Sequence, residues 1–266
     1  MTEDILKKIK QLPPLPESAM QIEAVYQDPD SSFNDMVLIL EKDPLLTADI
    51  LKAANSPLYG FSREINAISQ AVGLFGMGTV RGFALASIVK KSFTLELAPY
   101  GITNDMFSML SKKQHGLMTS WCLRKENKLL GVLSPAAFLV EIGKVLIAQQ
   151  VIADEKQEEF RDALKELGDV EAAERKIVGV DTPEVSATIF AQWKFEEGLV
   201  DVIRNCQNPE EAEEADKRPA QILHVVRVAV PINGVITDES IAAAKELITR
   251  YELDMDSFDK ALENAQ

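Results

Sequence analysis

Hydrophobic residues recur at helical spacing along most of the chain. Between residues 33 and 40 the apolar side chains fall on one helical face, and Ser32 with Asp35 forms a capping-box-like start. Asp43 and Pro44 then restart the pattern as N-cap and first helical residue. No run of alternating β-branched residues is closed by an Asn-Gly or Asp-Gly turn, as a hairpin requires. The pattern predicts an all-α protein built by helix-on-helix packing.

Glycine, proline and small polar residues interrupt this pattern at a few points. Gly76 and Gly78 are expected to break the stretch 65–93 into two helices, with Thr79 as a cap of the second. Ser134 and Pro135 have the residue types of an N-cap and a first helical position. The best candidate for a boundary between lobes is the stretch Pro99 to Asp105.

The charge of the chain limits the classes of partner. Among 266 residues, 28 are Lys or Arg and 42 are Asp or Glu, which gives a net charge of −14. A field of that sign repels nucleic acid and anionic membranes, so a broad DNA-binding face is not expected, although a local basic pocket is compatible with it. The hydrophobic share of 46% is that of an ordinary globular protein.

Cysteine content and hydropathy favour a reducing, aqueous compartment. The two cysteines, Cys122 and Cys206, lie in apolar or mixed helical sequence. The chain opens with a charged, amphipathic stretch that does not resemble a signal peptide, and no apolar run reaches the roughly 18 residues of a membrane span. These features predict a soluble, cytoplasmic protein with reduced thiols.

Common catalytic motifs are absent, and metal ligands of the softer kind are scarce. The chain has no phosphate-binding loop, dinucleotide fingerprint or nucleophile elbow. Its only His and Cys residues are His115, Cys122, Cys206 and His224, and none shows the close paired spacing of a structural zinc site. A site that needs several histidines is therefore disfavoured, and we expect no metal and no cofactor.

Three segments together resemble the HDOD family, a branch related to the HD-type metal-dependent phosphohydrolases. They are LPPLPESA (12–19), EKDPLLTADILKAANSPLYGF (41–61) and INAISQAVGLFGMGTVRGFALA (65–86). The resemblance covers residues 9–210 and implies a two-lobed helical fold with a role in bacterial signalling. The N-terminal lobe would span 9–98. The C-terminal lobe, 103–210, would correspond to the HD-phosphohydrolase core, and residues 211–266 would form a helical extension packed on it.

The resemblance also points to where a metal site would lie. The stretch LVEIGKVLI (139–147) aligns with the His-Asp doublet of the HD enzymes, with Val140 at the histidine and Glu141 at the aspartate. Thr182 stands at a later histidine, and Cys206 and Gln207 fall in a segment that ends in consecutive histidines in the family. Only His115 matches a family histidine. The resemblance therefore implies a vestigial pocket at a degenerate metal site, with no catalytic residue.

Several interpretations of the polar residues remain open at the level of sequence. Glu141 would pair with Lys144 three residues on, line a residual pocket with His115, or still hold a metal. His115 would be a hydrogen-bonded core residue or part of that pocket. The basic residues near the N-terminal motifs would contact an acidic or phosphorylated partner, or form a solvated helix face: Arg63, Arg81, Lys90 and Lys91.

These considerations give one main hypothesis and two alternatives. The main one is a non-catalytic signalling module that binds a partner protein or small ligand through the cleft between lobes or an exposed helix face. Because no receiver, cyclase or phosphodiesterase domain fits in the chain, its output is expected in trans, and homo-oligomers are compatible with it. The alternatives are a divergent phosphohydrolase that uses His115, Glu141 and other carboxylates, and a nucleic-acid-binding regulator, which the net charge opposes.

Overall fold

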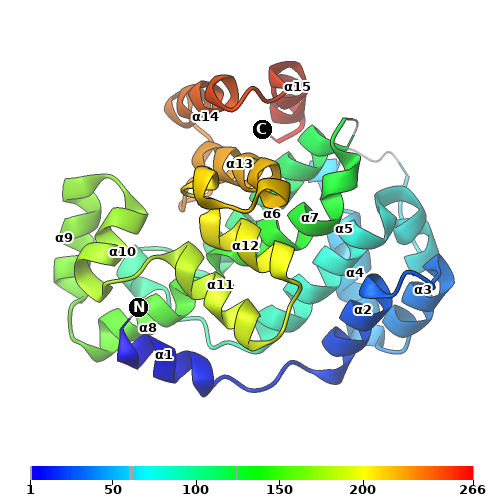
Figure 1. Ribbon diagram of the computed structural model, residues 1–266, viewed down its shortest axis with the longest axis horizontal. Coiled ribbons are helices and arrows are strands. Elements are labelled where there is room, and N and C mark those ends of the chain that lie inside the picture. The colour runs from blue at the N-terminus through cyan, green and yellow to red at the C-terminus, as the bar shows by residue number, and fades with distance from the viewer. Residues whose placement is uncertain (1, 60–62, 124, 266) are drawn as a thin grey trace.

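The regular structure is helical throughout the part of the chain that the computed structural model describes, residues 2–59, 63–123 and 125–265 (Figure 1). This confirms the all-α, two-lobed fold predicted from the sequence. Single 3-10 turns are labelled η. The elements are α1 (Glu3–Lys10), α2 (Glu17–Gln27), α3 (Phe33–Glu41), α4 (Pro44–Ala54), η1 (Pro57–Tyr59), α5 (Ile68–Lys91), η2 (Ala98–Tyr100), α6 (Asn104–Cys122), η3 (Asn127–Leu129), α7 (Leu130–Leu139), η4 (Val140–Ile142), α8 (Gly143–Ala153), α9 (Gln157–Leu167), α10 (Val170–Val178), α11 (Thr182–Gln192), α12 (Glu197–Asn205), η5 (Pro209–Glu211), α13 (Glu214–Ala229), α14 (Asp238–Arg250) and α15 (Met255–Ala265).

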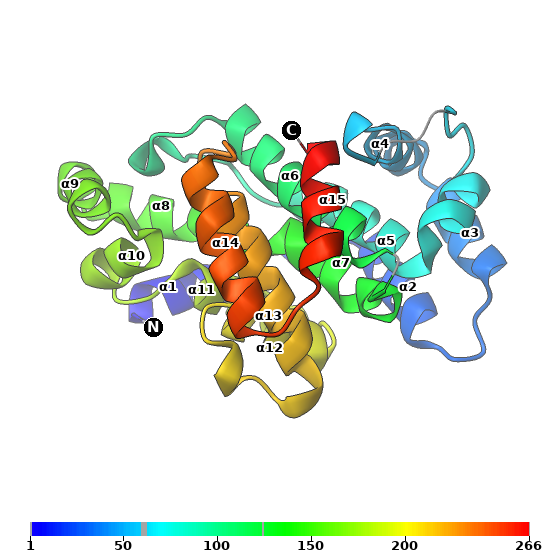
Figure 2. The ribbon, with the colours of Figure 1, turned by 90° about the horizontal axis from the view of Figure 1, so that it is seen from above.

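The helices form two groups that share one long contact. Helices α2, α3 and α4 pack on α5 at one end of the molecule, and α5 in turn packs along α7 (Figure 1). Helices α6 to α12 form the second group, in which α8, α9 and α10 lie at the other end of the molecule and α1 packs against α8 and α11. Figure 2 shows the last three helices, with α14 beside α13 and α15 beside α6. The exact limits of the lobes and of the C-terminal extension stay predictions.

The two helix starts predicted at Ser32 and Asp43 are present, whereas those predicted at Thr79 and Ser134 are not. The Ser32–Asp35 capping box and the Asp43 N-cap are both present. Gly76, with φ 80° and ψ 162°, makes the expected break, which is a kink inside α5. Thr79 does not cap a helix there. The predicted start at Ser134 is wrong, because α7 begins at Leu130 and Pro135 lies inside it.

Helices α5 and α7 approach closely because glycines face each other across their contact. A Cβ atom on Gly82 would lie 2.3 Å from the Ser134 hydroxyl oxygen, and one on Gly78 would lie 2.6 Å from the Cα atom of Gly131. Both distances are far below van der Waals contact. The small residues therefore allow the helix that ends the N-terminal group to pack against the C-terminal group.

Arg81 on α5 also connects the two groups of helices through ion pairs and a hydrogen bond. Its side chain is fully buried, so neither interpretation of it as a surface residue is correct. It forms a double ion pair with Glu23 of α2, at 2.6 and 2.7 Å, and a third bond of 2.7 Å to Glu196. It also donates to the carbonyl of Gly131 at 3.1 Å. That carbonyl is free because Pro135, four residues on, has no N–H to offer it.

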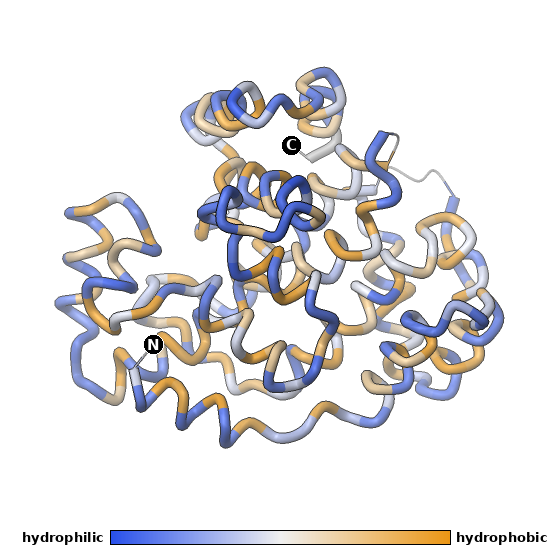
Figure 3. The backbone as a smooth tube through the Cα atoms, viewed as in Figure 1, coloured by the Kyte–Doolittle hydropathy of each residue, from blue (hydrophilic) through white to orange (hydrophobic). Residues whose placement is uncertain are grey.

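The hydrophobic core runs through both groups of helices. Figure 3 shows apolar and polar positions alternating with the turns of the outer helices, as the sequence pattern predicted. In α1, for example, Ile5 and Ile9 are buried and Lys7 between them is exposed. Figure 3 and the burial pattern agree that each outer helix contributes one apolar face to the core.

Two helical stretches meet the length and composition of a membrane span, Ile68–Lys91 and Asn127–Ala153. The prediction that none would do so is therefore corrected. Their most apolar windows are 61% and 83% buried inside the molecule. These stretches contain α5, α7 and α8, which are core helices of the fold.

Candidate functional site

Glu141 lies in the turn η4 and is almost completely buried, with 3% of its surface exposed. Its carboxylate contacts two cations: the Lys144 ammonium at 3.0 Å and the Arg227 guanidinium at 2.8 Å. The pairing with Lys144 that its spacing predicted is therefore present. Gln114 of α6 also donates to it, at 3.2 Å.

The same two cations hold two further carboxylates of α10. Arg227 donates to Glu171 at 2.6 Å, and Lys144 lies 3.3 Å from Glu174 and 3.9 Å from Glu171. We call these five residues, Glu141, Lys144, Glu171, Glu174 and Arg227, the charge cluster. It draws on η4, α8, α10 and α13, so four separate elements converge on one buried set of ion pairs.

Burial and pairing set the charge states in the cluster. Burial alone would raise the pKa of Glu141, but Arg227 and Lys144 outweigh it and lower that pKa far below its usual range. Burial lowers and the surrounding carboxylates raise the pKa of Lys144, with a net rise. Glu174 differs, because burial and the nearby Glu171 carboxylate raise its pKa. The two cations and Glu141 are thus fixed in their charged forms.

The structure brings four of the six predicted pocket residues to the charge cluster or its edge. Thr182 is buried and donates from its hydroxyl and its amide to Glu174, both at 2.6 Å. The sulfur of Cys206 lies 3.6 Å from Arg227, and burial raises its thiol pKa to about 12. Val140 is buried, and its carbonyl accepts from Ser186 at 2.6 Å. Glu141 is the fourth.

His115 lies in a separate, aromatic environment. Its Nδ1 atom is 2.5 Å from the Tyr59 hydroxyl, and its Nε2 atom is 2.8 Å from the Ser134 hydroxyl. The ring stacks on Phe138 with centroids 3.9 Å apart. Because it has no anionic partner, burial lowers its pKa to about 3, and it is neutral. His115 is the hydrogen-bonded core histidine that one interpretation expected. Gln207, the sixth position, is half-buried.

These residues do not fit a metal ion. Val140 offers no ligand atom, and the carboxylate of Glu141 is already engaged by two cations. Within residues 2–59, 63–123 and 125–265, no group of three or more His, Cys, Asp and Glu side chains is arranged to hold one. The charge cluster therefore supplies fixed positive charge at the point where a metal would need free donors.

Sequence reasoning missed Arg227, Glu171 and Glu174. A weak signal existed for each: Arg227 interrupts the apolar stretch 225–230 at the end of its helix, and Glu171 and Glu174 share one face of α10 at a spacing of three residues. Buried charges of opposite sign are expected to form ion pairs. Which carboxylate meets which cation depends on contacts between segments far apart in the chain.

An open cavity of about 700 Å³ lies beside the charge cluster, between the two groups of helices. Its walls come from α4, η1 and α5 on one side and from α6, α7 and η4 on the other. Ile142 of η4 lines it, directly after Glu141. The cleft between lobes is thus open, while the positions of the family's metal ligands are filled by side chains.

The HDOD domain family matches residues 12–209, and the chain belongs to this family. Its fold is similar to that of a virulence factor of Campylobacter jejuni subsp. jejuni, with 26% identity, a TM-score of 0.59 and coverage of 99% of this chain and 100% of that one. A candidate phosphohydrolase of Shewanella amazonensis SB2B is 24% identical, with a TM-score of 0.73 over 99% of this chain and 94% of that one.

A candidate signal transduction protein of Marinobacter aquaeolei VT8 is 19% identical, with a TM-score of 0.69 over 100% of this chain and 60% of that one. Among curated proteins, an uncharacterized protein of Treponema pallidum (strain Nichols) is 30% identical over 77 residues. That match spans 29% of this chain and 15% of the relative. The chain thus aligns with only a small part of the curated relative's length.

Proposed function

We propose that this chain is a non-catalytic HDOD signalling module that acts by binding a small ligand or a partner protein. The charge cluster is the observation that carries the proposal. An HD-type hydrolytic site needs protein ligands that hold a metal and present its bound water. Here Lys144 and Arg227 bind the carboxylates instead, so a divalent cation would meet repulsion from two fixed charges. This supports interpretation of the site as a degenerate metal site.

The choice of partner class follows from charge and shape. The net charge of −14 argues against nucleic acid and anionic membranes as partners. The cavity between the lobes favours a small ligand, and one of the similar folds belongs to a candidate signal transduction protein. We therefore favour ligand binding over DNA binding as the function. Binding to duplex DNA should be undetectable even at low salt.

Metal content and hydrolysis test the proposal together. Protein purified without chelator should carry no stoichiometric metal, and it should not hydrolyse a phosphodiester such as bis(p-nitrophenyl) phosphate with Mg²⁺, Mn²⁺ or Fe²⁺ supplied. Glu141→Ala should behave like the wild-type chain in this assay. Glu158→Ala, which changes an exposed carboxylate, is the matched control.

The opposite result would identify the divergent phosphohydrolase. It would consist of about one metal per chain and turnover that disappears in His115→Ala and Glu141→Ala but persists in Glu158→Ala. Both variants need a cooperative unfolding transition, so that loss of activity is not loss of fold.

A further inference from the structure

The cavity between the two groups of helices has the size of a small-molecule site. Its volume of about 700 Å³ falls within the roughly 300–1,000 Å³ that such sites occupy. Because its walls come from both groups of helices, a ligand in it would touch both at once. The cavity is distinct from the charge cluster, whose ionic side chains do not line it.

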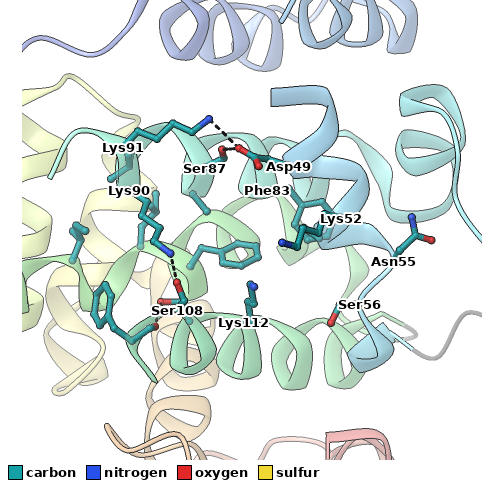
Figure 4. Close-up of a pocket in the computed structure, with 18 of the residues that line it drawn as sticks. Asp49, Lys52, Asn55, Ser56, Phe83, Ser87, Lys90, Lys91, Ser108 and Lys112 are labelled. Atoms are coloured by element: carbon teal, nitrogen blue, oxygen red, sulfur yellow. Dashed lines mark hydrogen bonds and ion pairs between the residues drawn. The ribbon is translucent and has the colours of Figure 1, made fainter. Parts of the chain in front are cut away.

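The cavity is basic, although the chain as a whole is strongly acidic. Four lysines line it against a single carboxylate: Lys52, Lys90, Lys91, Lys112 and, as the carboxylate, Asp49. Lys91 is paired with Asp49 at 2.9 Å, and Ser87 donates to the same carboxylate at 2.6 Å (Figure 4). Lys90 donates to the Ser108 hydroxyl and forms no ion pair within the described residues, although Asp105 and Asp49 lie near enough to offset part of its charge.

Two of these lysines have no carboxylate of their own. Within the described residues, Lys52 of α4 and Lys112 of α6 form no ion pair, and Figure 4 shows both beside the same opening as Lys90. Burial and then the like charge of Lys112 lower the pKa of Lys90. Asp105 and Asp49 offset part of this effect. Lys90 and Lys112 therefore repel each other, and an anion between them would remove that cost.

Another part of the wall is aromatic, beside small polar and aliphatic residues. Phe83, Phe107 and Phe138 line the cavity together with Tyr59. Edge-to-face contacts join three of these rings: Phe83 lies 5.7 Å from both Tyr59 and Phe138, measured between ring centroids. The hydroxyl of Tyr59 is bonded to His115, so this residue also offers mainly a ring face or edge. Such a surface binds a flat apolar ring.

We propose that this cavity binds a small phosphorylated molecule with a planar ring, which is the chemistry of a nucleotide. Phosphate oxygens would accept hydrogen bonds from Lys52, Lys90 and Lys112, and the ring would pack on the phenylalanines. The inference deepens the proposed function, since it names the ligand class of a module that responds without hydrolysis. The binding itself does not depend on whether the chain hydrolyses anything.

Calorimetric titration of the full chain tests the proposal with four probes: AMP, GMP, adenosine and inorganic pyrophosphate, at about 20 mM salt and without added metal. At least one of the two mononucleotides should bind. Adenosine, which lacks phosphate, and pyrophosphate, which lacks a ring, should each bind at least about tenfold more weakly. Raising the salt to about 0.5 M should weaken the mononucleotide.

Lysine variants locate the site. Lys52→Gln and Lys112→Gln should each weaken mononucleotide binding about tenfold, because each removes one charged donor. Both side chains are exposed and unpaired, so neither change should alter the unfolding transition. The matched control is Lys128→Gln, an exposed lysine that does not line the cavity, and its affinity should equal that of the wild-type chain.

Three results would overturn the inference: neither mononucleotide binds, pyrophosphate binds as tightly as the mononucleotides, or the two cavity variants bind like Lys128→Gln. A failure of the proposed function gives a different pattern. Metal-dependent hydrolysis that Glu141→Ala abolishes would refute the non-catalytic role, whether or not the lysine variants change nucleotide binding.

Discussion

Two buried polar residues, His115 and Glu141, are held in opposite ways. His115 has only neutral partners, so burial favours its uncharged form and lowers its pKa to about 3. Glu141 is equally buried but touches two cations, and its pKa falls because the ionised form is the one that is paired. The pKa of each residue is therefore determined by its partners as well as by its burial.

The neutral state of His115 predicts a loss of stability in mild acid. Its pKa is about 6.5 in the unfolded chain and about 3 in the folded one, so between these values the unfolded chain binds more protons. The free energy of unfolding therefore has its full value above about pH 6.5 and decreases as the pH falls toward 3. Between pH 7 and pH 5 the free energy of unfolding, measured with urea, should decrease by about 2 kcal/mol.

His115→Gln is the variant that isolates this effect. It can keep hydrogen bonds to Tyr59 and Ser134 but cannot take up a proton, so its stability should change less between pH 7 and pH 5. His224, whose pKa burial also lowers, to about 4, provides the comparison variant His224→Gln. Equal pH dependence in the wild-type chain and His115→Gln would refute the explanation.

The charge cluster predicts that removal of one cation is costly. Arg227→Met leaves Glu141 and Glu171 with only Lys144, and an unpaired buried charge typically costs about 3–5 kcal/mol. Arg218→Met is the control on the same helix, because its pair with Glu126 is partly exposed and should contribute about 1 kcal/mol or less. Urea unfolding at pH 7 compares the two, and equal losses would contradict the buried network.

Only part of this cluster was predictable from the sequence. The Glu141–Lys144 pair follows from a spacing of three residues. The bond from Arg227 to Glu141 joins residues 86 positions apart, and no local rule links them. The family resemblance pointed to the region around Glu141, but it could not show that a cation from outside the matched segment, Arg227, pairs with this carboxylate.

At the scale of helices, the contact between α5 and α7 depends on glycine. Gly82→Ala would place a methyl group 2.3 Å from the Ser134 hydroxyl, against the backbone of α7. The helices must move apart, and overpacking of this kind costs about 1–3 kcal/mol. Gly73→Ala, in the same helix, meets nothing within 4 Å and should stabilise by up to about 1 kcal/mol.

Thermal unfolding of these two variants checks the contact directly. The melting temperature should fall for Gly82→Ala and hold or rise for Gly73→Ala. A rise in both would mean that the contact between α5 and α7 has room for the extra methyl group, and the higher helix propensity of alanine would then explain both changes.

The same helices show why local sequence rules fail at this junction. Ser134 and Pro135 have the residue types of an N-cap and a first helical position, yet the first residue of α7 is Leu130. Ser134 instead bonds to His115, and Arg81 takes the carbonyl that Pro135 cannot satisfy. Caps at Ser32 and Asp43 were predictable because all their partners lie within three residues. Tertiary partners override the local signal at Ser134.

At the scale of the whole molecule, the helices after the family match belong to the core. Helix α13 supplies Arg227 to the charge cluster and packs on α6, α7 and α12. Helix α15 covers Trp121, whose indole donates to the Asp254 carbonyl at 2.9 Å and contacts the ring of Phe258. Helices α13 and α15 therefore contribute buried side chains to the core.

Truncation separates the contributions of these helices. A chain that ends at residue 209 loses α13 and with it Arg227, exposing apolar faces of α6, α7 and α12. This loss should exceed the roughly 5–15 kcal/mol by which domains are stable, so no cooperative unfolding is expected.

A chain that ends at residue 236 keeps α13 and should unfold cooperatively at a lower urea concentration than the full chain. Its Trp121 fluorescence should shift to the red, because α15 no longer covers the indole. If the chain ending at residue 209 unfolded like the full chain, α13 would not be needed to neutralise the buried carboxylates.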